Sequence, residues 1–267
     1  MTLLAIKCDD CGGSVAFSED KPLPECPFCG STKQIPQPLD RQVLPPSEWV
    51  SFDIDQQEAD DAFRVFAKSS FWYPKDIRNA TLELQMILLP AWLWSGSVET
   101  HYNGLTNAMT PSGYRPTSGE DTIHFSQVWV PSSKALTLNE LNDLAPFPSE
   151  QAQPLEDTPP LPFELGELTE RIALKHAKKV MSDSHHGHIF SQTGLRQLQT
   201  SSLHHDMEGR PGLVPVYIGV YRRKNNYYRI LINGSTGKLI GDAPLDWMKI
   251  TLIIAIFAGI ILVLLNI

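Results

Sequence analysis

All four cysteines of this 267-residue chain lie within its first thirty residues, in two pairs of identical spacing. Two residues separate Cys8 from Cys11, and two separate Cys26 from Cys29. Two such pairs can offer four thiolates to one tetrahedral Zn²⁺, which is the arrangement of a zinc ribbon. Because all four coordination positions are then filled, the spacing predicts one structural Zn²⁺ and no open position for a substrate.

The residues beside the cysteines suit two tight metal-binding turns. Gly12, Gly13 and Gly30 follow the second cysteine of each pair and allow the backbone to turn its N–H groups toward the sulfurs. The alternative, a pair of disulfides, would suit a secreted protein. No basic segment followed by a long apolar run opens the chain, so we expect no secretory signal and a reducing compartment.

Charge around the ribbon argues against nucleic acid as its partner. The chain has 22 basic and 30 acidic residues and a formal net charge of −8. Around the cysteines, three lysines face a larger number of carboxylates: Lys7, Lys21 and Lys33 against Asp9, Asp10, Glu19, Asp20 and Glu25. Such a surface would repel phosphate, so the ribbon is expected to bind protein. A membrane-tethered nucleic-acid-binding regulator is kept as an alternative.

The last eighteen residues, 250–267, carry no charge and are almost entirely apolar. As a helix at about 1.5 Å per residue they would reach about 27 Å, close to the about 30 Å hydrocarbon core of a bilayer. With Trp247 and Lys249 at its start, this pattern predicts a single transmembrane helix over 247–267. Basic residues precede the span and none follows it, which predicts a tail-anchored protein of the bacterial inner membrane with its N-terminal domain in the cytoplasm. The residues expected to contact the membrane surface are Arg222, Arg223, Lys224 and Lys249.

The middle of the chain combines helical and strand patterns. Apolar periodicity predicts helices over Asp55–Lys68, 137–144 and 164–181, with Asp55 and Glu58 as a capping box. Strands are expected from about Thr81 to Trp94, over 123–130, and as a three-stranded meander between Val214 and Ile240. Val214-Pro215 echoes Leu89-Pro90, which suggests a weak internal repeat.

These patterns predict an α+β protein in which an antiparallel β/α membrane-proximal domain follows the ribbon. The expected segments are the zinc ribbon (1–34), a proline-rich linker (35–50), a first α+β module (51–145), an acidic proline-rich loop (146–163), a second α+β module (164–244) and the transmembrane helix (247–267).

With these pieces in order, the chain resembles the bacterial transcription-factor-IIB-type zinc-ribbon membrane proteins, which are often mislabelled as primosomal helicase proteins. The resemblance rests on the four cysteines, Phe71-Trp72-Tyr73-Pro74, Leu89-Pro90, Val214-Pro215-Val216-Tyr217 and the segment 228–238, whose Asn-Gly-x-Thr-Gly-Lys turn is similar to the hairpin of PepSY-type β domains. It implies a non-enzymatic membrane partner or anchor, encoded in some operons beside stomatin/prohibitin/flotillin-type (SPFH) and phage-shock-type membrane-stress proteins. The acidic loop and a histidine-rich stretch depart from the family pattern.

That histidine-rich stretch motivates an enzymatic alternative. Five of the eight histidines lie between 185 and 205: His185, His186, His188, His204 and His205. Histidine with nearby carboxylates can build a catalytic metal site, so a metal-dependent hydrolase is possible. No H-E-x-x-H spacing is present, and a polar loop is the favoured interpretation of the stretch. His101, His124 and His176 are read as isolated structural residues.

Together these observations predict a membrane-anchored cytoplasmic zinc-ribbon adaptor that recruits protein partners and has no enzymatic activity. One structural Zn²⁺, lipid contacts at the membrane surface and SPFH-type or phage-shock-type partners complete the prediction, which leaves oligomerisation open.

Overall fold

The computed structural model describes residues 3–18, 24–36, 44–80, 82–106, 113–155, 161–223 and 226–265. All eleven described strands join one mixed sheet, whose main path runs β11-β10-β9-β5-β8-β2-β1-β3. The strands are β1 Leu3–Cys8, β2 Ser14–Ser18, β3 Gln34–Pro36, β4 Glu48–Trp49, β5 Gln85–Leu105, β6 Pro116–Pro131, β7 Gln153–Pro154, β8 Phe163–Glu164, β9 Arg196–Arg223, β10 Asn226–Asn233 and β11 Leu239–Gly241. The helices are α1 Gln56–Lys68, α2 Lys75–Arg78, α3 Leu138–Leu144, α4 Glu170–Thr193 and α5 Trp247–Leu265, and a single 3₁₀ turn covers Ser149–Gln151.

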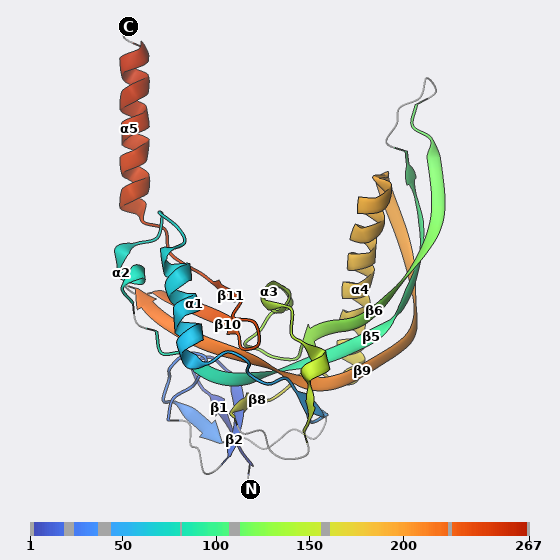
Figure 1. The fold of residues 1–267 in the computed structure, drawn as a ribbon, viewed down its shortest axis with the longest axis horizontal. Coiled ribbons are helices and arrows are strands. Elements are labelled where there is room, and N and C mark those ends of the chain that lie inside the picture. Colours follow the sequence, from blue (N-terminus) through green and yellow to red (C-terminus); the bar gives the residue numbers. More distant parts are fainter. Residues whose placement is uncertain are drawn as a thin grey trace.

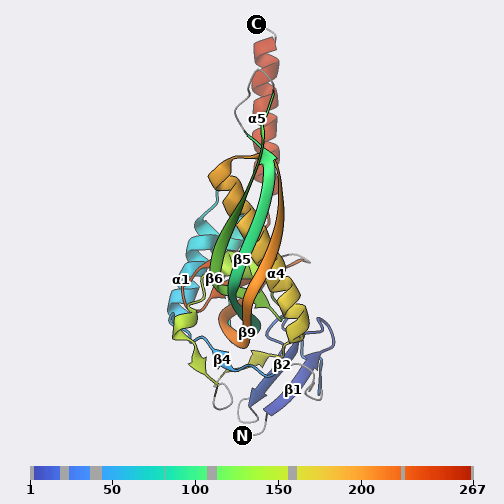
Figure 2. The ribbon, with the colours of Figure 1, turned by 90° about the vertical axis from the view of Figure 1, so that its right-hand side faces the viewer.

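Three of the strands are long and form a curved arm (Figure 1). β5 lies between β6 and β9 and pairs antiparallel with both. Helix α4 lies along the inner side of this arm, as Figures 1 and 2 show. The helix buries one residue per turn, namely Ala173, Ala177, Met181, His185 and Ile189. The first three of these pack in one cluster with Trp92, Trp94 and Val98 of β5. This four-residue spacing is the stripe that a helix needs to cover a sheet.

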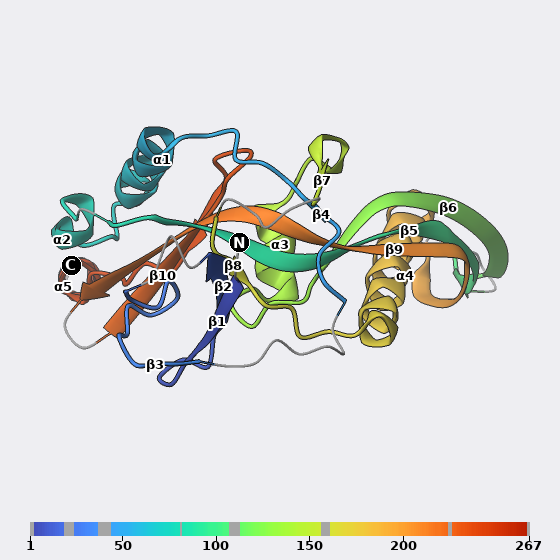
Figure 3. The same cartoon turned by 90° about the horizontal axis from the view of Figure 1, so that it is seen from below.

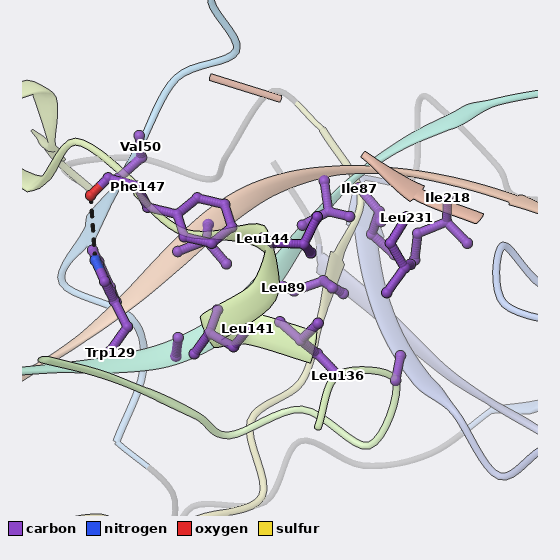
Figure 4. Packing of buried hydrophobic residues seen from close by; sticks show 14 of the residues in the cluster. Val50, Ile87, Leu89, Trp129, Leu136, Leu141, Leu144, Phe147, Ile218 and Leu231 are labelled. Atoms are coloured by element: carbon purple, nitrogen blue, oxygen red, sulfur yellow. Dashed lines mark hydrogen bonds between the residues drawn. The ribbon is translucent and has the colours of Figure 1, made fainter. Parts of the chain in front are cut away.

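The main core lies where β5, β9 and α3 meet (Figure 4). Ile87 and Leu89 of β5, Leu144 of α3 and Val214 of β9 are fully buried there. Trp129 closes one side of the core, and its indole N–H donates to the carbonyl of Phe147 at 3.3 Å.

The cysteine-bearing strands are continuous with this sheet. β2 pairs antiparallel with β8, and β8 pairs in parallel with β5 through Phe163 and Leu88; Figure 3 shows β1 and β2 beside β8. Val15 belongs to the main core, and Ile6 and Phe28 pack against it. The ribbon is therefore joined to the body by both backbone pairing and apolar contact.

The transmembrane prediction is wrong. Among the residues that the structure describes, no helix combines the length and apolar character needed to cross a bilayer. The predictions of a tail anchor and of a single-pass location in the inner membrane are corrected accordingly.

The predicted antiparallel β/α domain with a weak internal repeat is also wrong, because the strands join one mixed sheet. Leu89-Pro90 and Val214-Pro215 resemble each other, but they are neighbours: Leu89 pairs with Val214, and Leu88 pairs with Pro215. Two buried strands that face the same environment converge on similar apolar residues, which explains the likeness without a duplicated module.

Several local predictions are confirmed. α1 begins after Asp55, whose side chain and that of Glu58 form the expected capping box. The meander is present as β9, β10 and β11, and α3 occupies the expected residues behind a second capping box made by Thr137 and Glu140. α4 differs: it starts later than predicted and continues through the histidine-rich stretch to Thr193, ending at Gly194 in the left-handed conformation.

Candidate metal centre

The two cysteine pairs fold into matching turns. The amide of Gly12 donates to the carbonyl of Cys8 at 2.9 Å, and the amide of Gly30 donates to that of Cys26 at 2.8 Å. Gly12 and Gly30 have φ angles of +76° and +71°, a left-handed conformation that glycine adopts without steric cost. The sequence therefore places glycine where each turn needs it.

The turns bring all four sulfurs together. The four Sγ atoms lie within 4.8 Å of one another, with 3.6 Å from Cys8 to Cys29 and 3.6 Å from Cys11 to Cys26. Sulfurs at about 2.3 Å from a tetrahedral metal would be about 3.8 Å apart, whereas a disulfide needs about 2.05 Å. The predicted set of Cys8, Cys11, Cys26 and Cys29 thus forms one site that could hold a metal ion.

The thiols of this site differ in acidity. Burial opposes ionisation of Cys8, but the backbone N–H groups of Cys11 and Asp10 and the neighbouring thiols outweigh it and lower the pKa of Cys8 to about 7. Burial raises the pKa of Cys29 to about 11 and raises the pKa of Cys26 further. Binding a cation that requires four thiolates therefore releases protons, above all from Cys26 and Cys29.

A polar clasp ties the two turns together on their outer side. Asp10 accepts a hydrogen bond from the hydroxyl of Ser31 at 2.6 Å and pairs with Lys33 at 3.1 Å, and these contacts lower the pKa of Asp10. The amide of Asp9 donates to the carbonyl of Lys33 at 3.0 Å. Because Asp10 pairs with Lys33, one of the few basic side chains near the ribbon is neutralised, and the surface of the ribbon stays poor in unpaired positive charge.

Glu164 marks the junction between the ribbon and the body, and the sequence analysis did not single it out. It pairs with Val15 across β2 and β8 and is 1% exposed. Its carboxylate accepts from the amides of Lys134 at 3.0 Å and Ala135 at 3.4 Å and from the hydroxyl of Ser133. Burial, opposed by these hydrogen bonds, raises the pKa of Glu164 to about 7. A lone acidic residue after an apolar Leu161–Phe163 segment was the signal available in the sequence.

The histidine-rich stretch does not form the loop that the sequence suggested. His185, His186 and His188 lie on α4, and His204 and His205 lie on β9. His186 contacts Thr200 at 3.0 Å, and His204 contacts Ser182 at 3.1 Å. None of the five histidines belongs to a metal-competent group within the described residues. The hydrolase alternative therefore gains no support from this stretch.

His185 is instead the centre of a buried polar network between α4 and the arm. Its Nδ1 lies 2.9 Å from the hydroxyl of Thr100, and its Nε2 lies 3.0 Å from the carboxylate of Asp121. An acid, an imidazole and a hydroxyl in series resemble a hydrolytic triad, but Thr100 is fully buried and cannot reach a substrate. The hydrogen bond from His185 lowers the pKa of Asp121, so the network fastens the helix to the sheet.

Two of the four basic residues predicted at a membrane surface, Arg223 and Lys249, have partners within the chain. Arg223 pairs with Asp76 at 2.7 Å. Lys249 donates to the carbonyls of Phe71 at 2.7 Å and Tyr73 at 2.9 Å, which anchors the start of α5 to the body. Arg222 lies on β9, and Lys224 falls outside the described residues.

Comparisons of the chain with models of known protein families, with curated proteins and with solved structures found no match.

Proposed function

We propose that this chain is a non-enzymatic zinc-ribbon adaptor that binds protein partners. The observation that supports it most directly is the set of four sulfurs, within 4.8 Å of one another, contributed by two matching turns. Four thiolates in tetrahedral array favour Zn²⁺ over hard cations and leave no coordination position for a substrate. Such a site stabilises a surface and performs no chemistry of its own.

The surface beside the metal suits protein better than nucleic acid. Asp9 and Asp10 flank the first turn, and Lys33 is engaged by Asp10. β3 stands at the end of the sheet path, and the side chain of Ile35 on it is 54% exposed. A terminal strand with an apolar side chain can accept an extended segment of another polypeptide by strand addition.

Helix α5 offers a second surface for a partner. Ile256, Phe257 and Ile260 are among its large exposed apolar side chains, and contiguous exposed apolar surface of this kind marks sites of association. The family resemblance carried by the cysteines and the Val214–Lys238 segment makes SPFH-type and phage-shock-type proteins the first candidates to test as partners.

Co-purification of a tagged full-length chain, followed by mass spectrometry, tests the proposal. We expect Ile35→Asp, which leaves the cysteines in place, to lose partners that the wild-type chain retains, and Cys26→Ser to lose both those partners and one Zn²⁺ per chain. His188→Ala, on the distant helix α4, is the matched control and should retain both. Recovery of the same partners with Ile35→Asp and Cys26→Ser would contradict the proposal.

A further inference from the structure

The outer face of the arm, opposite α4, carries a cluster of histidines and glutamates from three strands. Successive residues of β5 point to opposite faces, so Glu99 and His101 lie on the face away from the buried Val98 and Thr100. Glu120 of β6 pairs with His101. His205 of β9 pairs with Ser97, one step along the same face from Glu99. The sequence analysis read His101 as isolated, because its neighbours come from strands distant in the chain.

The donor atoms of this cluster are close together. His101 Nε2 lies 3.1 Å from Glu99 Oε1, and His101 Nδ1 lies 3.8 Å from Glu120 Oε2. The second oxygen of Glu99 lies 3.5 Å from His205 Nε2. When each residue offers a single ligand atom, the atoms of Glu99, His101 and Glu120 all lie within 4.8 Å of one another. Nitrogen and oxygen ligands at about 2.0–2.1 Å from a tetrahedral metal are about 3.4 Å apart, so these three side chains are close enough to serve one ion.

The backbone under the cluster is held in place. β5 is paired on both sides along this segment, and the alternate residues Val98 and Thr100 are fully buried beneath it. His185 of α4 braces the same segment through Thr100. Small side-chain rotations are therefore enough to close the donors around an ion, without movement of the sheet.

The cluster is also open to solvent. An open pocket of about 620 Å³ adjoins it and is lined by residues of all three strands, among them His101, Asn103, Ser118, Glu120 and Ser201. An ion held by Glu99, His101 and Glu120 would thus keep a position for water or for a small ligand in this pocket.

We propose that Glu99, His101 and Glu120 form a second metal site, separate from the cysteines, that binds a divalent transition-metal ion. Imidazole with carboxylate is a ligand set suited to Zn²⁺ and Co²⁺, whereas Ca²⁺ and Mg²⁺ favour sites built from oxygen alone. Two carboxylates with one neutral imidazole would balance the charge of a divalent ion. The site is independent of the adaptor function, because its residues lie on the arm and not on the ribbon.

Calorimetric titration of the full-length chain with Zn²⁺, after the cysteine site has been loaded, tests this inference. We expect one further equivalent of Zn²⁺ to bind, and neither Mg²⁺ nor Ca²⁺ to compete with it. His101→Ala and Glu99→Gln should weaken this binding at least as much as the about 10- to 100-fold loss that follows removal of an outer-shell partner of a metal. His188→Ala, a histidine outside the cluster, should leave it unchanged.

Two further measurements exclude trivial explanations. The substituted side chains are exposed, so the variants should melt like the wild-type chain without added metal. Co²⁺ bound at this site should absorb without the thiolate charge-transfer bands that the cysteines would give. Absence of a second equivalent, equal binding by His101→Ala, or thiolate bands on the second Co²⁺ would each overturn the proposal and leave the cluster as surface His–Glu ion pairs only.

Discussion

Replacement of Glu164 by glutamine should make the chain more stable at neutral and alkaline pH. The buried carboxyl accepts two backbone amides through one oxygen and contacts the hydroxyl of Ser133 through the other. The carbonyl of glutamine can accept the same two amides, and its NH₂ group can donate to Ser133. Glu164→Gln thus mimics the protonated carboxylic acid and keeps its hydrogen bonds.

The size of the effect follows from the raised pKa. Burial raises the folded-state pKa of Glu164 from 4.5 to about 7. Between these two values the folded chain keeps a proton that the unfolded chain releases, so the wild-type chain loses stability as the pH rises through this window. At about 1.36 kcal/mol per pKa unit, the loss is of order 3 kcal/mol by about pH 8. Glu164→Gln should not show this loss of stability, because glutamine does not ionise.

Urea unfolding of both chains between about pH 5 and pH 8, with the cysteine site saturated with metal, measures this difference. The two free energies of unfolding should be similar near pH 5 and diverge by about 3 kcal/mol near pH 8. Glu167→Gln is the matched control, because Glu167 is close by, partly exposed and paired with Lys134; it should shift stability by no more than about 0.5 kcal/mol. Parallel curves for the wild-type chain and Glu164→Gln would refute the assignment of a proton to this carboxyl.

Three other substitutions test how the arm is held. His185→Ala should lower the free energy of unfolding by about 2–4 kcal/mol, because it removes a fully buried side chain that is hydrogen-bonded to Thr100 and Asp121. Urea unfolding measures this loss, with His188→Ala as the control. Equal stability of His185→Ala and the wild-type chain would count against the network. Gly209→Ala should cost about 1–3 kcal/mol, because a Cβ there would lie 2.5 Å from the ring of buried Trp94. Gly187→Ala on α4, where a Cβ meets nothing within 4 Å, should instead stabilise the helix by about 0.5–1 kcal/mol in the same thermal or urea assay.

The cysteine site and the helix cap were predictable from the sequence, because each depends on residues that are only a few positions apart. The two Cys-x2-Cys pairs, Gly12 and Gly30 specify their turns without help from the rest of the chain. The capping box of Asp55 and Glu58 likewise fixes the start of α1. Such signals survive because each is satisfied by residues within about one turn of one another.

Long-range pairing was not predictable in the same way. β8 has only two residues, Phe163 and Glu164. Such a strand is too short to show an alternation of apolar and polar residues, so the sequence does not indicate that it joins the ribbon to β5. α4 was cut short because His185 and its neighbours read as polar, although His185 continues the four-residue buried stripe of Ala177 and Met181. Apolar composition beyond Ile250 was read as a bilayer span, but no helix within the described residues combines the length and apolar character that a span needs.

The junction at Glu164 affects how tightly the cysteines hold a metal ion as the pH falls. Protons compete with the cation for the thiols, above all at Cys26 and Cys29, which by itself would loosen the metal as the pH falls. Protonation of Glu164 removes the cost of a buried charge on β8, the strand that pairs with β2 of the ribbon. By thermodynamic reciprocity, a more stable β2–β8 junction lets the ribbon retain its ion more tightly. The two tendencies oppose each other, so metal retention by the whole chain should vary less between mildly acidic and neutral solution than retention by an excised ribbon peptide.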